Sequence, residues 1–177
     1  GVNELESQIV AIGRGDKPEA NLFAAPIAHN VVPLCETFRP EDAYSTEEVK
    51  LLFETRKILG PTHQGGEIDV SMTCVRVPVP VGHSATMLIE TEQPLSPTQA
   101  RQALEGFPGI RVVDDISQNQ FPTPMDVVGV DEVLVGRIRK DLGSDRLWLW
   151  QVSDNLRKGA ATNAVQIAEA LRSRSLI

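Results

Sequence analysis

Two basic side chains of different kinds, Arg76 and His83, stand seven residues apart and bracket the run CVRVPVPVGH. A guanidinium can hold a carboxylate through two parallel hydrogen bonds, and an imidazole can give or take a proton near neutral pH. The two groups together suit a small anionic substrate, on which one binds and the other moves a proton. This pair is therefore the first candidate for a functional site.

The two side chains can meet only if the chain turns back between them, because seven extended residues span roughly 23 Å. A β-rich run at 70–77 leads into two prolines and Gly82, and a strand-like run at 83–91 follows. This order predicts a hairpin with both side chains at one open end. The alternatives are a structural ion pair for Arg76 and a satisfied polar position for His83.

Glu54 and Lys57 lie three residues apart, which places them on one face of a helix. The run STEE starting at Ser45 has the spacing of a capping box, and the helix that it opens ends at Gly60. Pattern alone favours a solvated ion pair, and Lys50 strengthens that interpretation because it lies four residues before Glu54. A role in ligand binding stays open.

The sequence does not offer a convincing nucleophile or metal site. Cys74 is two residues from Arg76 on the same predicted strand face, but a free cysteine in an apolar strand is more often an inert core residue. Cys35, in a loop with prolines, is no better. His29 and His63 have no ligand-like spacing with His83, so we expect no metal.

The segment DNLRKGAA at 154–161 joins the last predicted strand to the last predicted helix. Asp154 or Asn155 can cap that helix. Gly159, followed by two alanines, allows another backbone or a flat ligand to approach closely. The pattern does not choose between tight packing and a cofactor.

Length and composition describe an ordinary globular chain. Its 177 residues predict one domain over 1–177, and a net charge of −7 without a basic stripe argues against nucleic acid as a partner. The absence of an apolar run of about 18 residues argues against a membrane span, and no signal peptide opens the chain. Two cysteines indicate a reducing cytoplasm. Helical periodicity directly after Gly1 suggests a piece of a longer protein.

The remaining pattern predicts an α+β fold with a mixed, mostly antiparallel sheet, because neighbouring strands are joined by short turns. We expect helices largely on one face and dimerisation through the other, as a two-fold homodimer. A loop-rich segment covers about 14–44. The predicted helices are 2–13, 45–60, 97–106 and 156–172, and the predicted strands are 70–77, 83–91, 110–114, 132–139 and 147–153.

Taken together, these runs resemble the C-terminal catalytic and dimerisation domain of the aspartate-semialdehyde dehydrogenase family. The resemblance extends over nearly the whole chain from about residue 26. The matching runs are PIAHNVVP at 26–33, ETRKIL at 54–59, TCVRVPVPVGHS at 73–84, VGRIRKDL at 135–142 and LWQVSDNLRKGAATNAVQIAEAL at 149–171.

Members of that family reduce β-aspartyl phosphate to aspartate semialdehyde with NADPH and release phosphate, in the biosynthesis of lysine, methionine and threonine. The resemblance implies that Arg76 holds the substrate carboxylate and that His83 is the general acid and base. It also implies that Glu54 contacts the substrate amino group and Lys57 the phosphate. Asn155 would then lie near the nicotinamide of NADP.

The family's nucleotide-binding fingerprint, catalytic cysteine and orienting glutamine precede this domain, so we expect the chain to be inactive alone. The cysteine at the TCVR position is not the family's nucleophile, which agrees with an inert Cys74. Two alternatives stay open: a stand-alone dimerisation or ligand-binding module, and a related enzyme such as N-acetylglutamyl-phosphate reductase. Glu54 bears on the second, because a carboxylate suits a free amino group and not an acetylated one.

Overall fold

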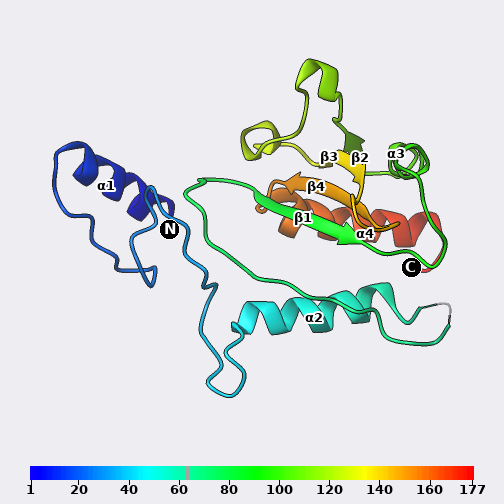
Figure 1. Cartoon of the computed structure of the whole chain (residues 1–177), viewed down its shortest axis with the longest axis horizontal. Coiled ribbons are helices and arrows are strands. Elements are labelled where there is room, and N and C mark those ends of the chain that lie inside the picture. The colour runs from blue at the N-terminus through cyan, green and yellow to red at the C-terminus, as the bar shows by residue number, and fades with distance from the viewer. Residues whose placement is uncertain (63) are drawn as a thin grey trace. The chain divides into compact units, whose positions relative to one another are not determined.

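A computed structural model describes residues 1–62 and 64–177, so His63 lies outside the described residues (Figure 1). The chain divides into two compact units, Gly1–Pro80 and Val81–Ile177. The predicted α+β class is confirmed, since the described residues form four α-helices and a four-stranded mixed sheet that is mostly antiparallel. Each unit is described by itself.

The first unit begins with α1 (Val2–Gly13), and the irregular segment that follows is folded against this helix. Leu5 of α1 packs with Ile27, Ala28 and Val32 in a small buried cluster. Gln8 is 2% exposed and holds the same segment by hydrogen bonds. Much of the loop-rich segment predicted at 14–44, from Glu19 to Val32, is therefore held against α1.

The second helix of this unit, α2 (Thr46–Leu59), starts at the predicted capping box. The Glu48 amide donates to Ser45 Oγ (3.3 Å), and the Ser45 amide donates to Glu48 Oε2 (2.7 Å). An extended segment then runs back along the helix. Arg56 Nε donates to the Ile68 carbonyl (3.1 Å), and the Cys74 amide donates to Glu48 Oε1 (2.8 Å).

The predicted strand at 70–77, and with it the hairpin to 83–91, is wrong. In this segment Arg76 forms only an isolated bridge with Val32. The Cys74 amide is taken by the Glu48 carboxylate, and the Val79 amide closes a tight turn onto the Val77 carbonyl (2.8 Å). Backbone donors engaged in this way, together with two prolines that have none, cannot form a continuous ladder.

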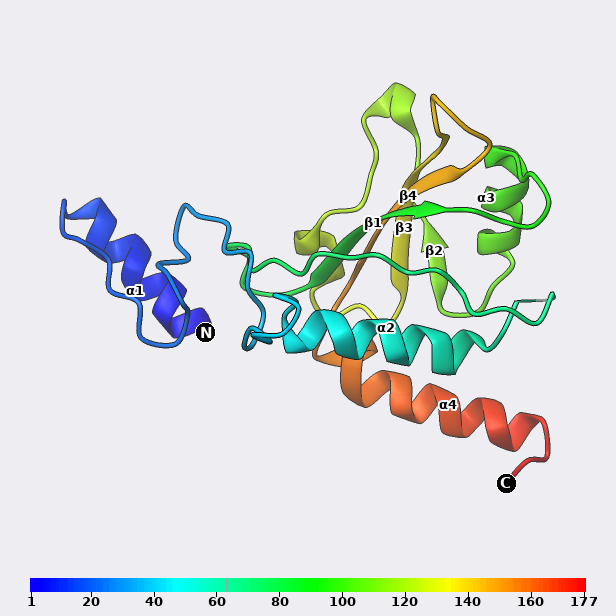
Figure 2. The same cartoon turned by 60° about the horizontal axis from the view of Figure 1, so that its bottom comes forward.

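The second unit is built around a sheet with the order β1-β4-β3-β2 (Figure 2). β1 pairs antiparallel with β4, β4 antiparallel with β3, and β3 parallel with β2. Its strands and longer helices are β1 (His83–Ile89), α3 (Pro97–Glu105), β2 (Ile110–Val112), β3 (Val133–Lys140), β4 (Leu147–Ser153) and α4 (Thr162–Ser173). Shorter helical turns are η1 (Ile116–Gln118), η2 (Pro124–Val127) and η3 (Arg157–Ala161).

Both faces of this sheet carry apolar clusters, because successive strand residues point to opposite faces. On one face α3 packs against the strands through a cluster of Ala100, Val135, Ile138, Leu147 and Leu149. On the other face η2 packs through Val127, together with Leu134 and Val152. A β-bulge between Gly136 and Arg139 interrupts β3, and Asp114 stabilises it by accepting the amides of residues 137 and 138.

The last predicted helix differs from the structure at its start. Residues 157–161 form the π-helical turn η3, and α4 proper begins at Thr162. The predicted apolar stripe is present in sequence, but no residue of α4 is buried. The wider turn of a π-helix shifts the phase of the residues on either side of it, which the constant spacing assumed from the sequence does not allow for.

Candidate functional site

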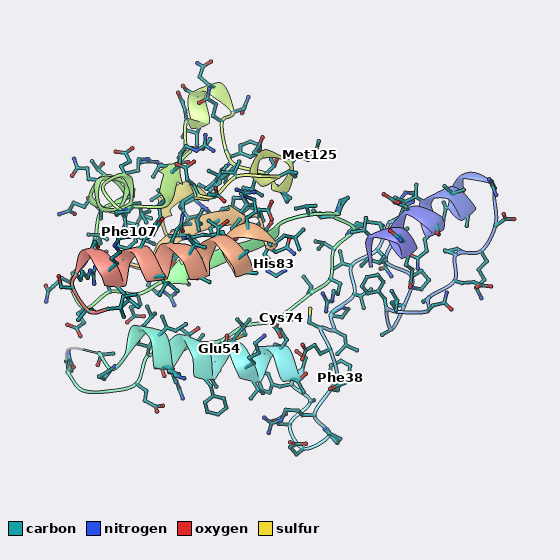
Figure 3. The ribbon with its side chains drawn as sticks, turned by 180° about the vertical axis from the view of Figure 1, so that it is seen from behind. Phe38, Glu54, Cys74, His83, Phe107 and Met125 are labelled. Atoms are coloured by element: carbon teal, nitrogen blue, oxygen red, sulfur yellow. The ribbon has the colours of Figure 1, made fainter. Side chains whose placement is uncertain are left out.

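Three of the five predicted site residues belong to the first unit. Glu54 and Lys57 lie on α2, and Arg76 lies on the extended segment that returns along that helix; Figure 3 labels Glu54 on α2 and Cys74 on this segment. All three side chains are exposed. Among the described residues none of them forms an ion pair, while Lys50 pairs with Glu47 instead (3.1 Å). The solvated Glu54–Lys57 pair that pattern favoured is therefore not formed.

The two cysteines are poor nucleophiles in this setting. Both lie in the first unit and are free, Cys35 buried and Cys74 partly buried. Burial raises the pKa of both thiols above the ordinary value of 9.0, which disfavours the reactive thiolate. The structure thus supports the interpretation of both as inert packing residues.

The other two predicted site residues, His83 and Asn155, both lie in the second unit, where β1 begins and β4 ends. His83 opens β1 directly opposite Ser153, the last residue of β4, and its side chain is exposed. Two residues beyond Ser153, the Asn155 Oδ1 atom accepts the Gly82 amide (2.9 Å). One side chain from the end of β4 therefore fixes the backbone at the start of β1.

Asp154 supports this junction through backbone amides on both sides of it. It is 3% exposed, and its carboxylate accepts the amides of Gly129 (2.9 Å), Leu156 (2.8 Å) and Arg157 (3.2 Å). These bonds, from Gly129 first, hold the pKa of Asp154 below its ordinary value of 3.8 despite burial. The predicted N-cap at Asp154 or Asn155 is wrong, since Leu156 is the N-cap residue of η3 and forms no side-chain cap. Asp154 instead holds the turn before η3, and the neighbouring Asn155 bonds to Gly82.

A second carboxylate at this junction was not found from the sequence. Asp131 accepts both Nε (2.7 Å) and Nη2 (2.8 Å) of Arg157, and also the Thr162 hydroxyl (2.8 Å). These bonds, that of Arg157 above all, lower the pKa of Asp131 to about 2. No local pattern identifies such a contact, because Asp131 lies 26 residues before its partner. For Gly82 the sequence predicts only a turn.

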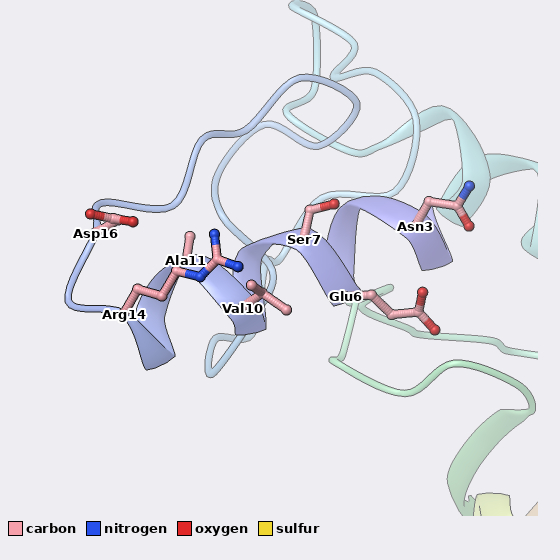
Figure 4. A pocket seen from close by; sticks show the side chains of 7 residues that line it. All are labelled: Asn3, Glu6, Ser7, Val10, Ala11, Arg14 and Asp16. Atoms are coloured by element: carbon pink, nitrogen blue, oxygen red, sulfur yellow. The ribbon is translucent and has the colours of Figure 1, made fainter.

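The surface of each unit adds little to this site. A hollow of about 470 Å³ lies along α1, but most of its side chains lie in a row on the helix, and only Asp16 comes from the segment that follows (Figure 4). In the second unit a hollow of about 300 Å³ lies on the η2 side of the sheet, with Arg137, Arg139 and Trp150 in its wall. The described residues contain no group of three or more metal-ligating side chains, and none of their helices is long and apolar enough to cross a membrane.

Residues 1–158 match the family described as "Semialdehyde dehydrogenase, dimerisation domain". An aspartate-semialdehyde dehydrogenase of Aquifex aeolicus is 47% identical over 99% of this chain, which corresponds to 51% of that relative. One of Bacillus subtilis is 40% identical over 98% of the chain and 48% of its own length. The chain thus spans about half the length of the curated relatives that it matches.

Solved structures agree with the sequence relatives. Aspartate semialdehyde dehydrogenase II of Vibrio cholerae is 41% identical with a TM-score of 0.88, over 98% of this chain and 50% of its own. The same enzyme complexed with ASA is 41% identical with a TM-score of 0.87, over 97% and 49%. The chain therefore belongs to the semialdehyde dehydrogenase family and corresponds to the C-terminal, dimerisation part of its members.

Proposed function

We propose that this chain is the C-terminal part of an aspartate-semialdehyde dehydrogenase. The whole enzyme would convert β-aspartyl phosphate to aspartate semialdehyde and phosphate, with NADPH as the reductant. The observation that carries the proposal is the 47% identity, over 99% of the chain, to a relative that bears this name. As half of such an enzyme, the chain is expected to be inactive by itself.

The exposed charges of the first unit suit the polar groups of that substrate. Arg76 offers a guanidinium for the substrate carboxylate, Lys57 an ammonium for the phosphate, and Glu54 a carboxylate for the free amino group. None of the three is neutralised by another described residue. Unpaired charges of this kind are available to a ligand at no cost in broken ion pairs.

His83 is proposed as the general acid and base of the reaction. An imidazole can protonate the oxygen that leaves or develops charge at the reacting carbonyl, and can take the proton back in the reverse direction. Its exposure on β1 leaves it accessible to a substrate, while strand pairing fixes its backbone. Such a residue combines a fixed position with an accessible ring.

NADP is the cofactor that the family implies, and Asn155 is the residue of this chain that fits its edge. The bond from Gly82 occupies the amide oxygen of Asn155 and leaves the Nδ2 donors for a carboxamide or ribose oxygen. The bound cofactor would supply the reducing equivalents. Most of its binding surface would belong to a part of the enzyme outside this chain.

A homodimer formed through the open part of the sheet completes the proposal. The face opposite α3 is covered by η2 at one end, while Leu88 and Trp150 on the same face remain partly exposed. Leu88→Glu should convert a dimer into a monomer in sedimentation at micromolar concentration. Met87→Glu, on the adjacent residue that points to the other face, is the matched control.

The substrate assignment is tested in an enzyme reconstituted by joining this chain to the N-terminal half of the Aquifex aeolicus relative. Glu54→Gln should raise the KM for aspartate semialdehyde about tenfold or more, because a charge-assisted hydrogen bond to the amino group is lost. Glu47→Gln, on the same helix, is the control. An unchanged KM in both variants would favour an acylated substrate, as in N-acetylglutamyl-phosphate reductase.

Calorimetric titration of the chain itself separates the enzyme from a non-catalytic module. Phosphate and aspartate analogues should bind to the unmodified chain and bind at least tenfold more weakly to Arg76→Ala. Equal heats for the two proteins would favour the stand-alone dimerisation module.

A further inference from the structure

We propose that Asn155 is a positioning residue for His83, acting through the Gly82 amide, in addition to the cofactor contact assigned to it above. The inference deepens the proposed function and rests on the role of His83 given there. It starts from the 2.9 Å hydrogen bond between the Gly82 amide and Asn155 Oδ1, which joins residues 73 positions apart. The donor is the amide that immediately precedes His83.

The orientation of the Asn155 amide is fixed by this bond. A backbone N–H can be accepted only by the carbonyl oxygen of the side chain, so the Nδ2 group must point away from Gly82. A single planar group therefore holds the histidine segment with one end and presents two donors with the other. A ligand at the Nδ2 end would act directly on the group that holds His83.

The backbone of Gly82 is restrained from a second direction. Its φ is +102°, a conformation that favours glycine, and a Cβ atom there would lie 3.3 Å from Val127 Cγ2 and 3.4 Å from Pro124 Cβ. The η2 turn thus closes one side of Gly82 while Asn155 holds the amide. The two restraints thus act on the residue directly before His83, which starts β1 in register with Ser153.

Asn155 is itself held in place by its neighbours. Buried Asp154 accepts three backbone amides, one of them from Gly129 in the turn that follows η2. Arg157 is tied to Asp131 on the other side of the turn. Both connections lie outside β1, so the position of the proposed acid and base is set by the end of β4 and not by its own strand alone.

The first test uses the chain as it is and follows two NMR readouts. In Asn155→Ala the Gly82 amide should exchange with solvent at least about tenfold faster, and the backbone order parameter of His83 should fall below about 0.7. Asn155→Asp keeps an acceptor oxygen and should retain slow exchange. Asn163→Ala, the same change in the first turn of α4, should alter neither readout. Unchanged Gly82 exchange in a folded Asn155→Ala protein would overturn the proposal.

The second test uses the reconstituted enzyme described above. Asn155→Ala should lower kcat about 10 to 100-fold, because a misplaced acid and base loses effective proton transfer. Asn155→Asp, which lacks the amide donors, should raise the KM for NADPH with a much smaller loss of kcat. A rise in the NADPH KM alone in Asn155→Ala would overturn positioning and leave only a cofactor contact. Full activity of His83→Asn would instead overturn the proposed role of His83 as acid and base, independently of the results for the Asn155 variants.

Discussion

The two units of the chain are stabilised in different ways. The second unit buries apolar side chains on both faces of a sheet, in clusters around Val135 and Val152. The first unit has no sheet among its described residues. It has a small apolar cluster around Leu5, and its irregular segments are held in addition by hydrogen bonds of buried polar side chains, above all Gln8 and Glu48. The second unit is thus stabilised mainly by non-directional packing, and the first unit depends more on directional hydrogen bonds.

This difference bears on the candidate site. Arg76 lies on a segment whose nearest anchors are the bridge to Val32 and the Cys74 bond to Glu48. His83 lies on a strand that is paired along its whole length with β4. We infer that the position of Arg76, the proposed carboxylate-binding residue, depends on a few hydrogen bonds, whereas His83, the proposed acid and base, lies on a packed sheet.

The largest effect is expected where the packing of the second unit is tightest. A Cβ atom at Gly136 would lie 2.3 Å from the Val113 carbonyl oxygen and 2.6 Å from Pro122 Cδ. Gly136→Ala should therefore destabilise this unit by at least about 3 kcal/mol, since backbone atoms must move. Both tryptophans, Trp148 and Trp150, lie in this unit, so urea unfolding followed by fluorescence measures it.

Gly143→Ala is the control, because the atom that a Cβ there would meet is Asp141 Oδ2 at 3.9 Å. Its effect should stay within about 0.5 kcal/mol. A Gly136→Ala protein as stable as this control would show that the sheet yields more readily than its packing indicates.

The next effect belongs to the first unit. Gln8 Oε1 accepts the buried amides of Ile27 (2.8 Å) and Ala28 (3.0 Å), and Nε2 donates to the Glu19 carbonyl (2.7 Å). Gln8→Ala leaves these groups without partners and should cost about 2 to 3 kcal/mol. Hydrogen exchange at Ile27 and Ala28 should accelerate about 30-fold or more, while tryptophan fluorescence keeps its unfolding midpoint.

Gln8→Glu keeps an acceptor for both amides and loses only the donor. The amides of Ile27 and Ala28 should therefore exchange more slowly in Gln8→Glu than in Gln8→Ala. A lower unfolding midpoint by tryptophan fluorescence in either variant would mean that the two units unfold together. The contrast between the two units would then apply to their local contacts and not to their stabilities.

Local signals explain what the sequence could predict of this fold. The capping box predicted at Ser45 forms, a second one is found at Ser96, and each helix begins at the next residue. Runs rich in β-forming residues place β1, β3 and β4 within a few residues of their observed bounds. Such features depend on neighbours in sequence, which a single chain displays directly.

Distant partners account for the failures. The run at 70–77 has strand composition, yet its Cys74 amide bonds to a carboxylate 26 residues earlier, and β1 pairs with β4 and not with this run. The same limit applies to the site. Residue chemistry and resemblance selected His83 and Asn155, but the Gly82 bond that links them joins positions 73 residues apart. Residue types thus predicted the candidate site residues, but the hydrogen bonds that hold these residues in place depend on pairing between distant parts of the chain.

Glu48 offers a smaller test of the polar anchors, through pH. Hydrogen bonds from the Ser45 and Cys74 amides, that of Ser45 first, lower the pKa of Glu48 from its ordinary value of 4.5. The stability that the carboxylate contributes is therefore complete above pH 4.5 and is lost as the pH falls through the lower folded pKa. Glu48→Gln should cost about 1 to 2 kcal/mol at pH 7 and little once Glu48 is protonated.

Exchange protection of the Cys74 amide, measured from pH 7 to pH 3, follows this effect at the bond itself. Glu47→Gln is the control, because Glu47 forms a surface pair with Lys50 (3.1 Å) and, among residues 1–62 and 64–177, no other ion pair. A constant difference between Glu48→Gln and the unmodified chain over this pH range would contradict the assigned cause.

The smallest effect is expected for a charged contact in the second unit. The Arg139 guanidinium carbon lies 5.6 Å from the centre of the Trp148 ring, and its Nη1 donates to the Arg137 carbonyl (2.8 Å). Arg139→Ala should cost about 0.5 to 1 kcal/mol and change the Trp148 emission, because the cation leaves the ring. Lys140→Ala, which removes a surface pair with Asp145, should leave the emission unchanged. If Arg139→Ala lowered the free energy of unfolding by more than about 2 kcal/mol, Arg139 would contribute as much as Gln8. The second unit would then depend on directional contacts as strongly as the first, and the distinction between the two units would fail.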